Sequence, residues 1–364
     1  MENVKRFNTT GPCFPDEHYM LPALDRLPGI RELVAGGNYF VVHAPRQTGK
    51  TTALQALVRE INEKGDMFAI YCTLETLQGA SDSNESNIAI RDLIADNAEM
   101  SPHYSAVPGA PELRSDRGGV GLAIRTVLQN LCRAVKKPVV VFFDEADCLV
   151  GNALISFLRQ LRDGYVNRKM IPFPTSIALV GMLDVRDYKA QIRPDGESLG
   201  QISPFNIIRK DLLIPNFTES DIGTLYAQHT AETGQVFADG VVEDVWRLTR
   251  GQPWLVSAIA HECVEEIHGS RYDETITVAD VEAAKEAIIC ENPIHLDYLF
   301  DMVNSPRVRP YFDACLQGTV TEEMRCNKQF KFLHYLGFLR EEEDHFDFAN
   351  RLYKDYWNKR TTGI

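Results

Sequence analysis

Residues 44–51 read Ala44-Pro45-Arg46-Gln47-Thr48-Gly49-Lys50-Thr51. An apolar stretch, Tyr39-Phe40-Val41-Val42, comes directly before them, and the helix-forming run Ala53-Leu54-Gln55-Ala56-Leu57 comes directly after. The order strand, loop, helix is the context in which Gly-x-x-x-x-Gly-Lys-Thr predicts a phosphate-binding loop, although Ala44 stands here for the first glycine. Backbone N–H groups of such a loop converge on phosphate oxygens, and the helix that follows adds the positive end of its dipole.

Each residue at the end of this loop has its own expected task. Gly49 lets the backbone approach the phosphates, Lys50 neutralises charge between the outer two phosphates, and the Thr51 hydroxyl suits a Mg²⁺ ligand position. The alternative is an ordinary strand-to-helix turn with an exposed lysine, which the flanking pattern disfavours. We therefore expect the following residues to bind nucleotide: Ala44, Pro45, Arg46, Gln47, Thr48, Gly49, Lys50, Thr51 and Thr52.

A second motif indicates what kind of nucleotide protein this is. The run Val139-Val140-Val141-Phe142-Phe143 is β-branched and apolar throughout, which is typical of a strand buried on both faces of a parallel sheet. It ends in Asp144-Glu145. Asp144 can hold Mg²⁺ through water, and Glu145 can polarise the water that attacks the γ-phosphate. Such a pair is often only solvated surface, but its place after the most apolar run predicts ATP and Mg²⁺ binding with hydrolysis.

Composition limits the remaining classes. The chain has 364 residues, 44% of them hydrophobic, which suits two or three packed domains. It has neither an apolar segment of the roughly 20 residues that span a bilayer nor a secretory signal after Met1, so we expect a soluble, cytoplasmic protein. Its eight cysteines lack Cys-x-x-Cys spacing, which is typical of reduced thiols. The formal charge of −13 argues against a general polyanion-binding surface.

Strand and helix patterns alternate through the first two thirds of the chain, which predicts a parallel sheet with helices on both faces. We expect residues 1–36 to be an irregular lead-in and residues 37–215 to be the ATPase core. In the lead-in, His18 and Tyr19 are candidates for covering the nucleotide base, and the equal alternative is that they only pack this lead-in to the sheet. The expected strands are 39–42, 66–73, 139–143 and 174–181, and the expected helices are 28–35, 87–98, 120–134 and 152–163, with a loop at 99–119.

The residues after the last of these strands are candidates for sensing the γ-phosphate. They read Gly181-Met182-Leu183-Asp184-Val185-Arg186-Asp187-Tyr188. Because no Asn, Ser or Thr is present, Arg186 is the better candidate and Asp184 the next. The alternative for Arg186 is an ion pair with Asp184 or Asp187. Arg159, Arg162 and Arg168 are weaker candidates for reaching a neighbouring subunit's nucleotide, since a solvated helix face accounts for each of them.

Beyond residue 215 the pattern becomes helical. Thr218-Glu219-Ser220-Asp221 is a capping box that predicts a helix at 219–233, and further helices are expected at 239–249, from Trp254 and after Thr277-Val278-Ala279-Asp280. We expect residues 216–290 to form a helical lid. From 291, two helical stretches, a hairpin on either side of an acidic turn and a last helix capped by Asn350 predict a winged-helix domain at 291–364.

These motifs, with Gly251-Gln252-Pro253-Trp254, resemble the prokaryotic AAA-like P-loop ATPases close to the STAND and AAA+ class. The resemblance extends to Phe7-Asn8-Thr9-Thr10-Gly11-Pro12, Ser203-Pro204-Phe205-Asn206 and Asn216-Phe217-Thr218. It implies an α/β three-layer fold of the ASCE type with sheet order 5-1-4-3-2, an ATP-driven switch, and a Gly-x-Pro lid motif that touches the nucleotide. Pro253 is then a binding candidate; otherwise it merely stops a helix. The resembling proteins carry an arginine near the position of Leu183, so the sensing residue stays open.

Three functions follow. The first is a Mg²⁺-dependent ATPase switch that acts on a protein partner or on further copies of itself, with Glu145, Lys50 and Arg186 in catalysis and with Thr51 and Asp144 at the metal. The second is a DNA-associated ATPase, resembling origin-binding or transposition regulators. Its best basic stretch is Arg325-Cys326-Asn327-Lys328-Gln329-Phe330-Lys331, but the neighbouring wing is acidic. The third is a nucleotide-binding module with negligible turnover.

Overall fold

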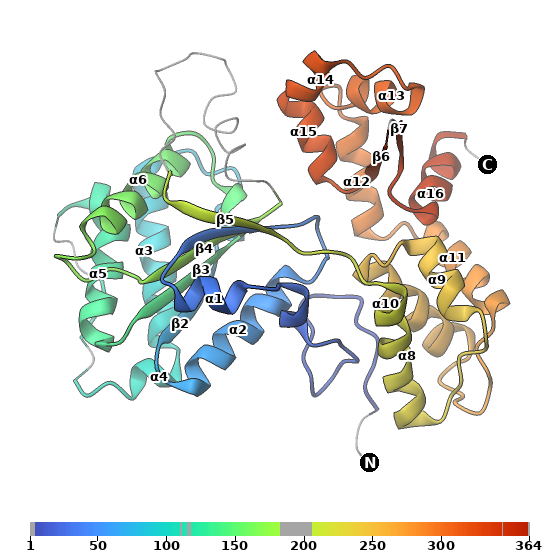
Figure 1. Ribbon diagram of the computed structural model, residues 1–364, viewed down its shortest axis with the longest axis horizontal. Helices are drawn as coiled ribbons and strands as arrows, with labels where there is room; N and C mark the ends of the chain where they lie inside the picture. The colour runs from blue at the N-terminus through green and yellow to red at the C-terminus, as the bar shows by residue number, and fades with distance from the viewer. Residues whose placement is uncertain (1–3, 110, 115–117, 183–205, 344, 363–364) are drawn as a thin grey trace. The chain divides into compact units, whose positions relative to one another are not determined.

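The computed structural model describes residues 4–109, 111–114, 118–182, 206–343 and 345–362. Its chain divides into two compact units. The sheet unit comprises Leu24–Ala44 and Ala53–Ile214, and the helical unit comprises Met1–Ala23, Pro45–Thr52 and Pro215–Ile364. Figure 1 labels the helices and strands of both.

A five-stranded parallel sheet forms the centre of the sheet unit, and its order is β2-β3-β4-β1-β5. This confirms the expected order 5-1-4-3-2. In register, Val41 lies opposite Leu179, and Thr73 lies opposite Asp144. Every residue of β3 and β4 is buried, as expected for strands covered on both faces. The strands are β1 (Tyr39–His43), β2 (Phe68–Thr73), β3 (Val139–Asp144), β4 (Ser176–Gly181) and β5 (Ile208–Leu213).

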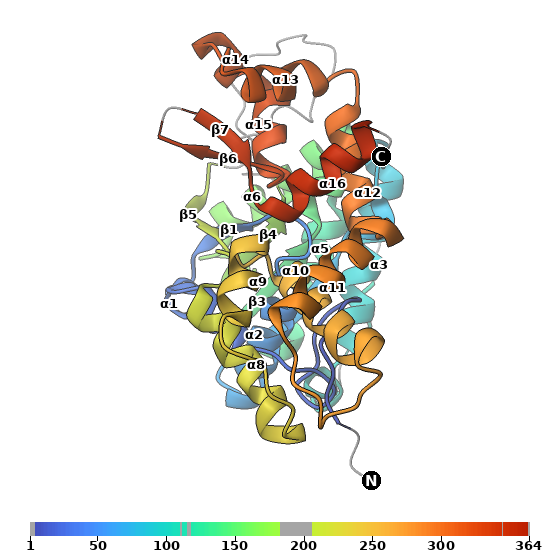
Figure 2. The same cartoon turned by 90° about the vertical axis from the view of Figure 1, so that its right-hand side faces the viewer.

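Helices cover both faces of this sheet. The helices α3, α5 and α6 pack against one another on one face, and α1 and α2 lie on the other (Figures 1 and 2). The helices are α1 (Ile30–Ala35), α2 (Lys50–Lys64), α3 (Ser83–Glu99), α4 (Pro102–Ser105), α5 (Ala123–Val135) and α6 (Gly151–Asn167). Short 3-10 turns lie at Ala23–Arg26, Glu75–Leu77, Val120–Leu122 and Ala146–Cys148. The stretch expected to be a loop at 99–119 therefore contains one short helix, α4.

The helical unit begins with the helices expected after residue 215. Both predicted capping boxes are present, with Thr218 and Asp221 at α8 and with Thr277 and Asp280 at α11. The helices are α8 (Glu219–Thr233), α9 (Val241–Thr249), α10 (Pro253–His261) and α11 (Val278–Glu291), and a π-helical turn, Glu262–Ile267, continues α10.

The C-terminal part of this unit ends as expected, with a hairpin of β6 (Leu339–Glu342) and β7 (His345–Phe348) before α16 (Arg351–Thr362). Asn350 caps α16, since its Oδ1 accepts a hydrogen bond from Tyr353 N. The prediction of two helices before the hairpin was wrong, because the described chain has four. They are α12 (Ile294–Asn304), α13 (Arg309–Gln317), α14 (Glu322–Cys326) and α15 (Lys328–Tyr335). Gly318, in the left-handed conformation at φ 66°, ends α13, and Asn327 ends α14 and caps α15.

The N-terminal segment contributes to the core of the helical unit. Phe7 and Tyr19 are both buried, with ring centroids 4.9 Å apart, and they pack against Tyr226 and His229 of α8. A second aromatic group joins Phe312, Phe338 and Trp357 near the hairpin. No described helix has both the length and the apolar composition needed to cross a membrane.

Candidate functional site

The candidate phosphate-binding loop leaves the carboxyl end of β1 and enters α2 at Lys50. Ala44 N donates a hydrogen bond to Gly181 O of β4 at 3.3 Å, so this residue ties the start of the loop to the sheet. Gln47 and Gly49 both have left-handed backbones, with φ of 58° and 90°. A non-glycine residue in this conformation is strained, and such strain concentrates at ligand sites.

The functional side chains of the loop are turned towards its own backbone. Lys50 is buried, and its Nζ donates to Pro45 O at 2.9 Å. The Thr48 hydroxyl donates to the same carbonyl oxygen, also at 2.9 Å. Thr51 follows in the first turn of α2 and is half-buried. An ammonium held at the backbone of such a loop fits the binding of a polyphosphate, because the cation and the loop N–H groups can serve the same anion.

The N-terminal segment reaches the end of the loop. Cys13 N donates to Thr52 Oγ1 at 3.1 Å, and burial raises the pKa of the Cys13 thiol, which keeps it protonated. His18 accepts a hydrogen bond from Phe14 N at 2.9 Å. Burial lowers the pKa of His18, so its ring is neutral.

Tyr19 lies deeper in the same segment. Its hydroxyl is 3.2 Å from His229 Nδ1, and its side chain is only 3% exposed. These contacts fit the packing alternative for Tyr19, as the Phe14 hydrogen bond does for His18. A contact of either residue with the nucleotide base stays a prediction.

The Gly251-Gln252-Pro253 turn of the expected lid contacts the loop within the helical unit. Gly251 has φ 70°, and a Cβ at this position would lie 1.8 Å from Phe217 O, so only glycine fits. Gln252 caps α10 by accepting from Leu255 N at 2.7 Å, and its Nε2 donates to Gln47 O at 3.4 Å. Pro253 is buried at the first position of α10, where its missing N–H is tolerated. It therefore starts a helix, contrary to the alternative that it stops one.

The C-terminal helices and hairpin also contact the loop, and sequence reasoning missed these contacts. The Arg46 guanidinium lies over the ring of Tyr298 in α12, 4.6 Å from its centroid. A Cβ on Gly337 would lie 2.6 Å from Pro45 Cγ, so the turn before β6 lies against the loop. Aromatic residues are common in helices, so only the structure identifies Tyr298 as the partner of Arg46.

The acidic pair lies at the end of β3. Asp144 is 1% exposed, and its Oδ2 accepts a hydrogen bond from the Tyr71 hydroxyl of β2 at 2.8 Å. Glu145 N donates to Asp144 Oδ1, and the Glu145 backbone is left-handed, with φ 52°. The chain therefore turns sharply directly after the last residue of β3. Neither the contact of Tyr71 with Asp144 nor the left-handed backbone of Glu145 was predictable from the sequence.

A further carboxylate, Asp147, fixes the turn that follows. Its Oδ2 accepts a hydrogen bond from Met182 N at 2.8 Å, and a Cβ on Gly181 would lie 2.5 Å from its Oδ1. Asp147 therefore joins the ends of β3 and β4. Since β1, β4 and β3 are adjacent and parallel, the acidic pair and the start of the candidate loop leave the same edge of the sheet.

The candidates for sensing the γ-phosphate have no structural placement, because Arg186, Asp184 and the neighbouring Leu183 lie outside the described residues.

The three arginines considered for a neighbouring subunit's nucleotide are placed at α6. Arg159 and Arg162 are exposed on this helix. Arg168 donates from Nη1 to Gly37 O at 3.1 Å and to Thr175 O at 3.0 Å, so it fastens the end of α6 to the sheet.

The available donors fit magnesium better than a transition metal. Among the described residues, no cluster of three His, Cys, Asp or Glu side chains could hold a metal ion by itself. The predicted ligands, Thr51 and Asp144, offer oxygen atoms, and Mg²⁺ is typically held by one or two protein oxygens together with substrate phosphates and water.

No protein-family model matches the sequence, and no curated protein matches it. Among solved structures, a Walker-type ATPase of Pyrococcus abyssi is similar, with 15% identity, a TM-score of 0.59 and coverage of 97% of this chain and 99% of that one. The chain thus has the fold of this ATPase. Cdc6p from Pyrobaculum aerophilum is 14% identical, with a TM-score of 0.48 and coverage of 93% of this chain and 91% of that one. The RuvB Holliday junction branch migration motor of Thermotoga maritima is 13% identical, with a TM-score of 0.44 and coverage of 90% of each chain.

Proposed function

We propose that the chain is a Mg²⁺-dependent ATPase in which the nucleotide state sets the arrangement of the lid and the C-terminal helices. The contacts of one loop support this proposal most directly. Residues 45–52 contact the N-terminal segment through Thr52, the lid through Gln47, and the C-terminal helices through Arg46. A change in this loop would therefore affect all three parts of the helical unit.

In the binding step, the loop N–H groups and the N-terminus of α2 receive the phosphates. Lys50 leaves the Pro45 carbonyl and pairs with the outer phosphates. The Thr51 hydroxyl and, through water, Asp144 would hold Mg²⁺, which draws charge from the β- and γ-phosphates when bound. The Tyr71 hydrogen bond keeps the Asp144 carboxylate in one orientation.

In the hydrolytic step, Glu145 accepts a proton from the attacking water and directs the water at the γ-phosphate. Arg186 is the proposed sensor of that phosphate. Pro253 and Gln252 form the lid's proposed nucleotide contact, and Gln252 would exchange its bond with Gln47 when the loop rearranges.

Loss of the γ-phosphate then changes the preferred loop conformation. Because Arg46 and Gln47 contact the C-terminal helices and the lid, two loop conformations would favour two arrangements of these parts. The receiver of the change is proposed to be a protein partner or another copy of this chain.

Phosphate release tests the chemistry. We expect Glu145→Gln to lower the rate by about a hundredfold or more, because removal of a general base typically has this effect. Lys50→Ala should lose both hydrolysis and the thermal stabilisation that ATP with Mg²⁺ gives. Glu63→Gln, which changes an exposed carboxylate of α2, is the matched control and should leave the rate unchanged.

Two outcomes would change the assignment. If Glu145→Gln releases phosphate at the unmodified rate, Glu145 is not the base. If the unmodified protein is stabilised by ATP but releases no phosphate, the binding module without turnover replaces the ATPase switch.

A further inference from the structure

A cavity of about 650 Å³ opens in the sheet unit, away from every residue assigned to the nucleotide. Its lining includes Phe68, the first residue of β2, and Val135, the last residue of α5. It therefore lies at the amino ends of the strands, whereas the candidate phosphate loop follows the carboxyl end of β1. Its volume is in the range of small-molecule sites.

Apolar side chains form the body of the cavity. Met67 and Phe68 line it from the start of β2, and Val107, Pro108 and Pro111 line it from the chain after α4. Surfaces of this kind favour an alkyl or aromatic group, because apolar area is removed from water when such a group enters.

The charged part of the lining is basic. It comprises Arg133, Lys136 and Lys137, and of the described residues that line the cavity none is acidic; His103 and Asn62 are the other polar side chains. This local excess of cations contrasts with the formal charge of −13 of the whole chain. Lys137 Nζ donates to Gly65 O at 2.7 Å, which holds this ammonium at the rim.

Lys136 has an unusual position. It follows α5 as its C-cap with φ 55°, in the left-handed conformation that is most often adopted by glycine or asparagine at helix C-termini. A lysine here is less favourable for the backbone than glycine would be. The side chain lines the cavity.

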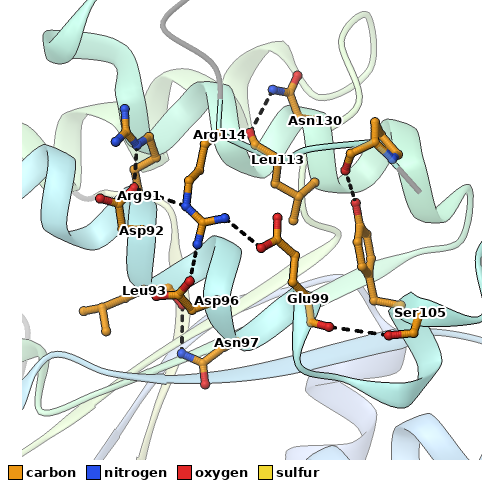
Figure 3. Close-up of polar contacts among 12 residues, drawn as sticks. Arg91, Asp92, Leu93, Asp96, Asn97, Glu99, Ser105, Leu113, Arg114 and Asn130 are labelled. Carbon is orange, nitrogen blue, oxygen red and sulfur yellow. Dashed lines mark hydrogen bonds and ion pairs between the residues drawn. The ribbon is translucent and has the colours of Figure 1, made fainter. Parts of the chain in front are cut away.

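The wall formed by the chain after α4 is held in place from several sides. Arg114 forms ion pairs with Asp92, Asp96 and Glu99 of α3, as Figure 3 shows. These three carboxylates lie on one face of α3, where they would repel one another without the guanidinium.

Two neutral hydrogen bonds hold the same wall. Leu113 O accepts a hydrogen bond from Asn130 of α5 at 3.2 Å (Figure 3). The Tyr104 hydroxyl donates to Pro111 O at 2.8 Å, which closes the segment on itself. Together with the ion pairs of Arg114, these bonds fasten Pro111 and Leu113, at the end of this wall, to Tyr104 and α5.

We propose that this cavity binds a small amphipathic anion, namely a carboxylate or phosphate carried on an aryl or short alkyl group. The apolar body enters between Phe68 and Val107, and the anion meets the cationic rim of Arg133, Lys136 and Lys137. The rim cations are exposed, and their attraction is screened by solvent. Both parts of the ligand are therefore required, and neither inorganic phosphate nor a neutral hydrocarbon should suffice.

Isothermal titration calorimetry on the full chain tests the proposal with 4-phenylbutyrate, phenyl phosphate and the uncharged 4-phenylbutanol. We expect one or both anions to bind and the alcohol to bind at least about tenfold more weakly. Lys136→Gly removes the charge while retaining the left-handed backbone, so the fold is kept and anion binding falls. Arg133→Glu combined with Lys136→Glu should lower the affinity by at least about tenfold.

The matched control is Lys169→Glu, a charge reversal at an exposed lysine after α6 that does not line the cavity. It should leave anion binding unchanged. Binding should also persist in Lys50→Ala, because a phosphate held by the candidate P-loop would be lost there. The proposal is overturned if neither anion binds below about 10 mM, if the alcohol binds equally well, or if Lys169→Glu or Lys50→Ala weakens binding as much as the cavity variants do.

Discussion

His295, at the start of α12, is buried, and its ring is surrounded by groups that keep it neutral. Its Nε2 is 3.0 Å from the Tyr353 hydroxyl, and its ring centroid is 5.3 Å from that of Trp254. Burial, reinforced by the charge of Arg46, lowers the pKa of His295 to about 3. The unfolded chain therefore takes up a proton here at a higher pH than the folded protein does.

This difference predicts a loss of stability as the pH falls. Between the unfolded pKa of about 6.5 and the folded value, protonation favours the unfolded state. From about pH 7 to about pH 5, His295 alone should lower the free energy of unfolding by roughly 2 kcal/mol. Denaturant unfolding of the wild type and of His295→Gln at both pH values measures this contribution, which the variant should lack.

His345→Gln, at an exposed histidine of β7, is the control and should keep the wild-type pH dependence. An unchanged pH dependence in His295→Gln would show that the ring is already accessible to protons in the folded state.

Residue patterns predicted those candidate site residues whose positions depend on local sequence. Lys50, Thr51 and Asp144 were picked out by their spacing after buried strands, and the structure places Asp144 at the end of β3 and Lys50 and Thr51 at the start of α2. Gln252 and Tyr298 were missed because their roles come from packing across more than 200 residues of chain, as the 205-residue separation of Gln252 from Gln47 illustrates. Hydrophobic periodicity carries no signal for such contacts.

At the scale of elements, hydrophobic content decided which strands could be predicted. The fully buried β3 and β4 were found, whereas β5 was not assigned to any stretch. Its sequence, Ile-Arg-Lys-Asp-Leu-Leu, has only one buried residue and lacks an apolar run, whereas β2, the other edge strand of the sheet, has four buried residues. Its place in the order was implied only by the family resemblance.

The contact of Arg46 in the candidate phosphate loop with Tyr298 in α12 is expected to restrain the loop. Removing the Tyr298 ring in Tyr298→Ala should free Arg46 and loosen the loop, since a cation–π pair contributes about 0.5–2 kcal/mol. Hydrogen exchange of the N–H groups in residues 45–52 should then become severalfold faster. Tyr298→Phe keeps the ring and should change the exchange less. Equal exchange in the two variants would mean that the ring does not restrain the loop.

In the whole molecule, the two compact units are joined through the candidate phosphate loop as well as near residues 23 and 214. The chain passes from the sheet unit to the helical unit at Ala44–Pro45 and returns at Thr52–Ala53. The loop therefore belongs to the packing of the helical unit, while the strand before it and most of the helix after it belong to the sheet unit. This division was not predictable from periodicity, since the loop is short and continuous with β1 and α2.

The charge distribution of the molecule argues against the alternative function of DNA binding. Lys328 and Lys331 of α15 are exposed, but Arg325 Nη1 lies 2.6 Å from Glu341 Oε1 of β6, and Arg340 pairs with Glu342 at 2.9 Å. Glutamates of β6 thus neutralise both Arg325 and Arg340. The chain as a whole has a formal net charge of −13. Nucleic-acid affinity depends on cations that are free to displace counterions from phosphates.

We therefore expect only weak binding of duplex DNA, with a Kd above about 1 μM at roughly physiological salt, in an electrophoretic mobility shift. Glu341→Gln releases Arg325 and should raise the affinity a few fold, with a salt dependence steeper by about one phosphate contact. Lys328→Glu combined with Lys331→Glu should change little in the unmodified background, because there is little binding to lose. A shift at nanomolar protein that this double variant abolishes would contradict the expectation and would assign the C-terminal helices to DNA.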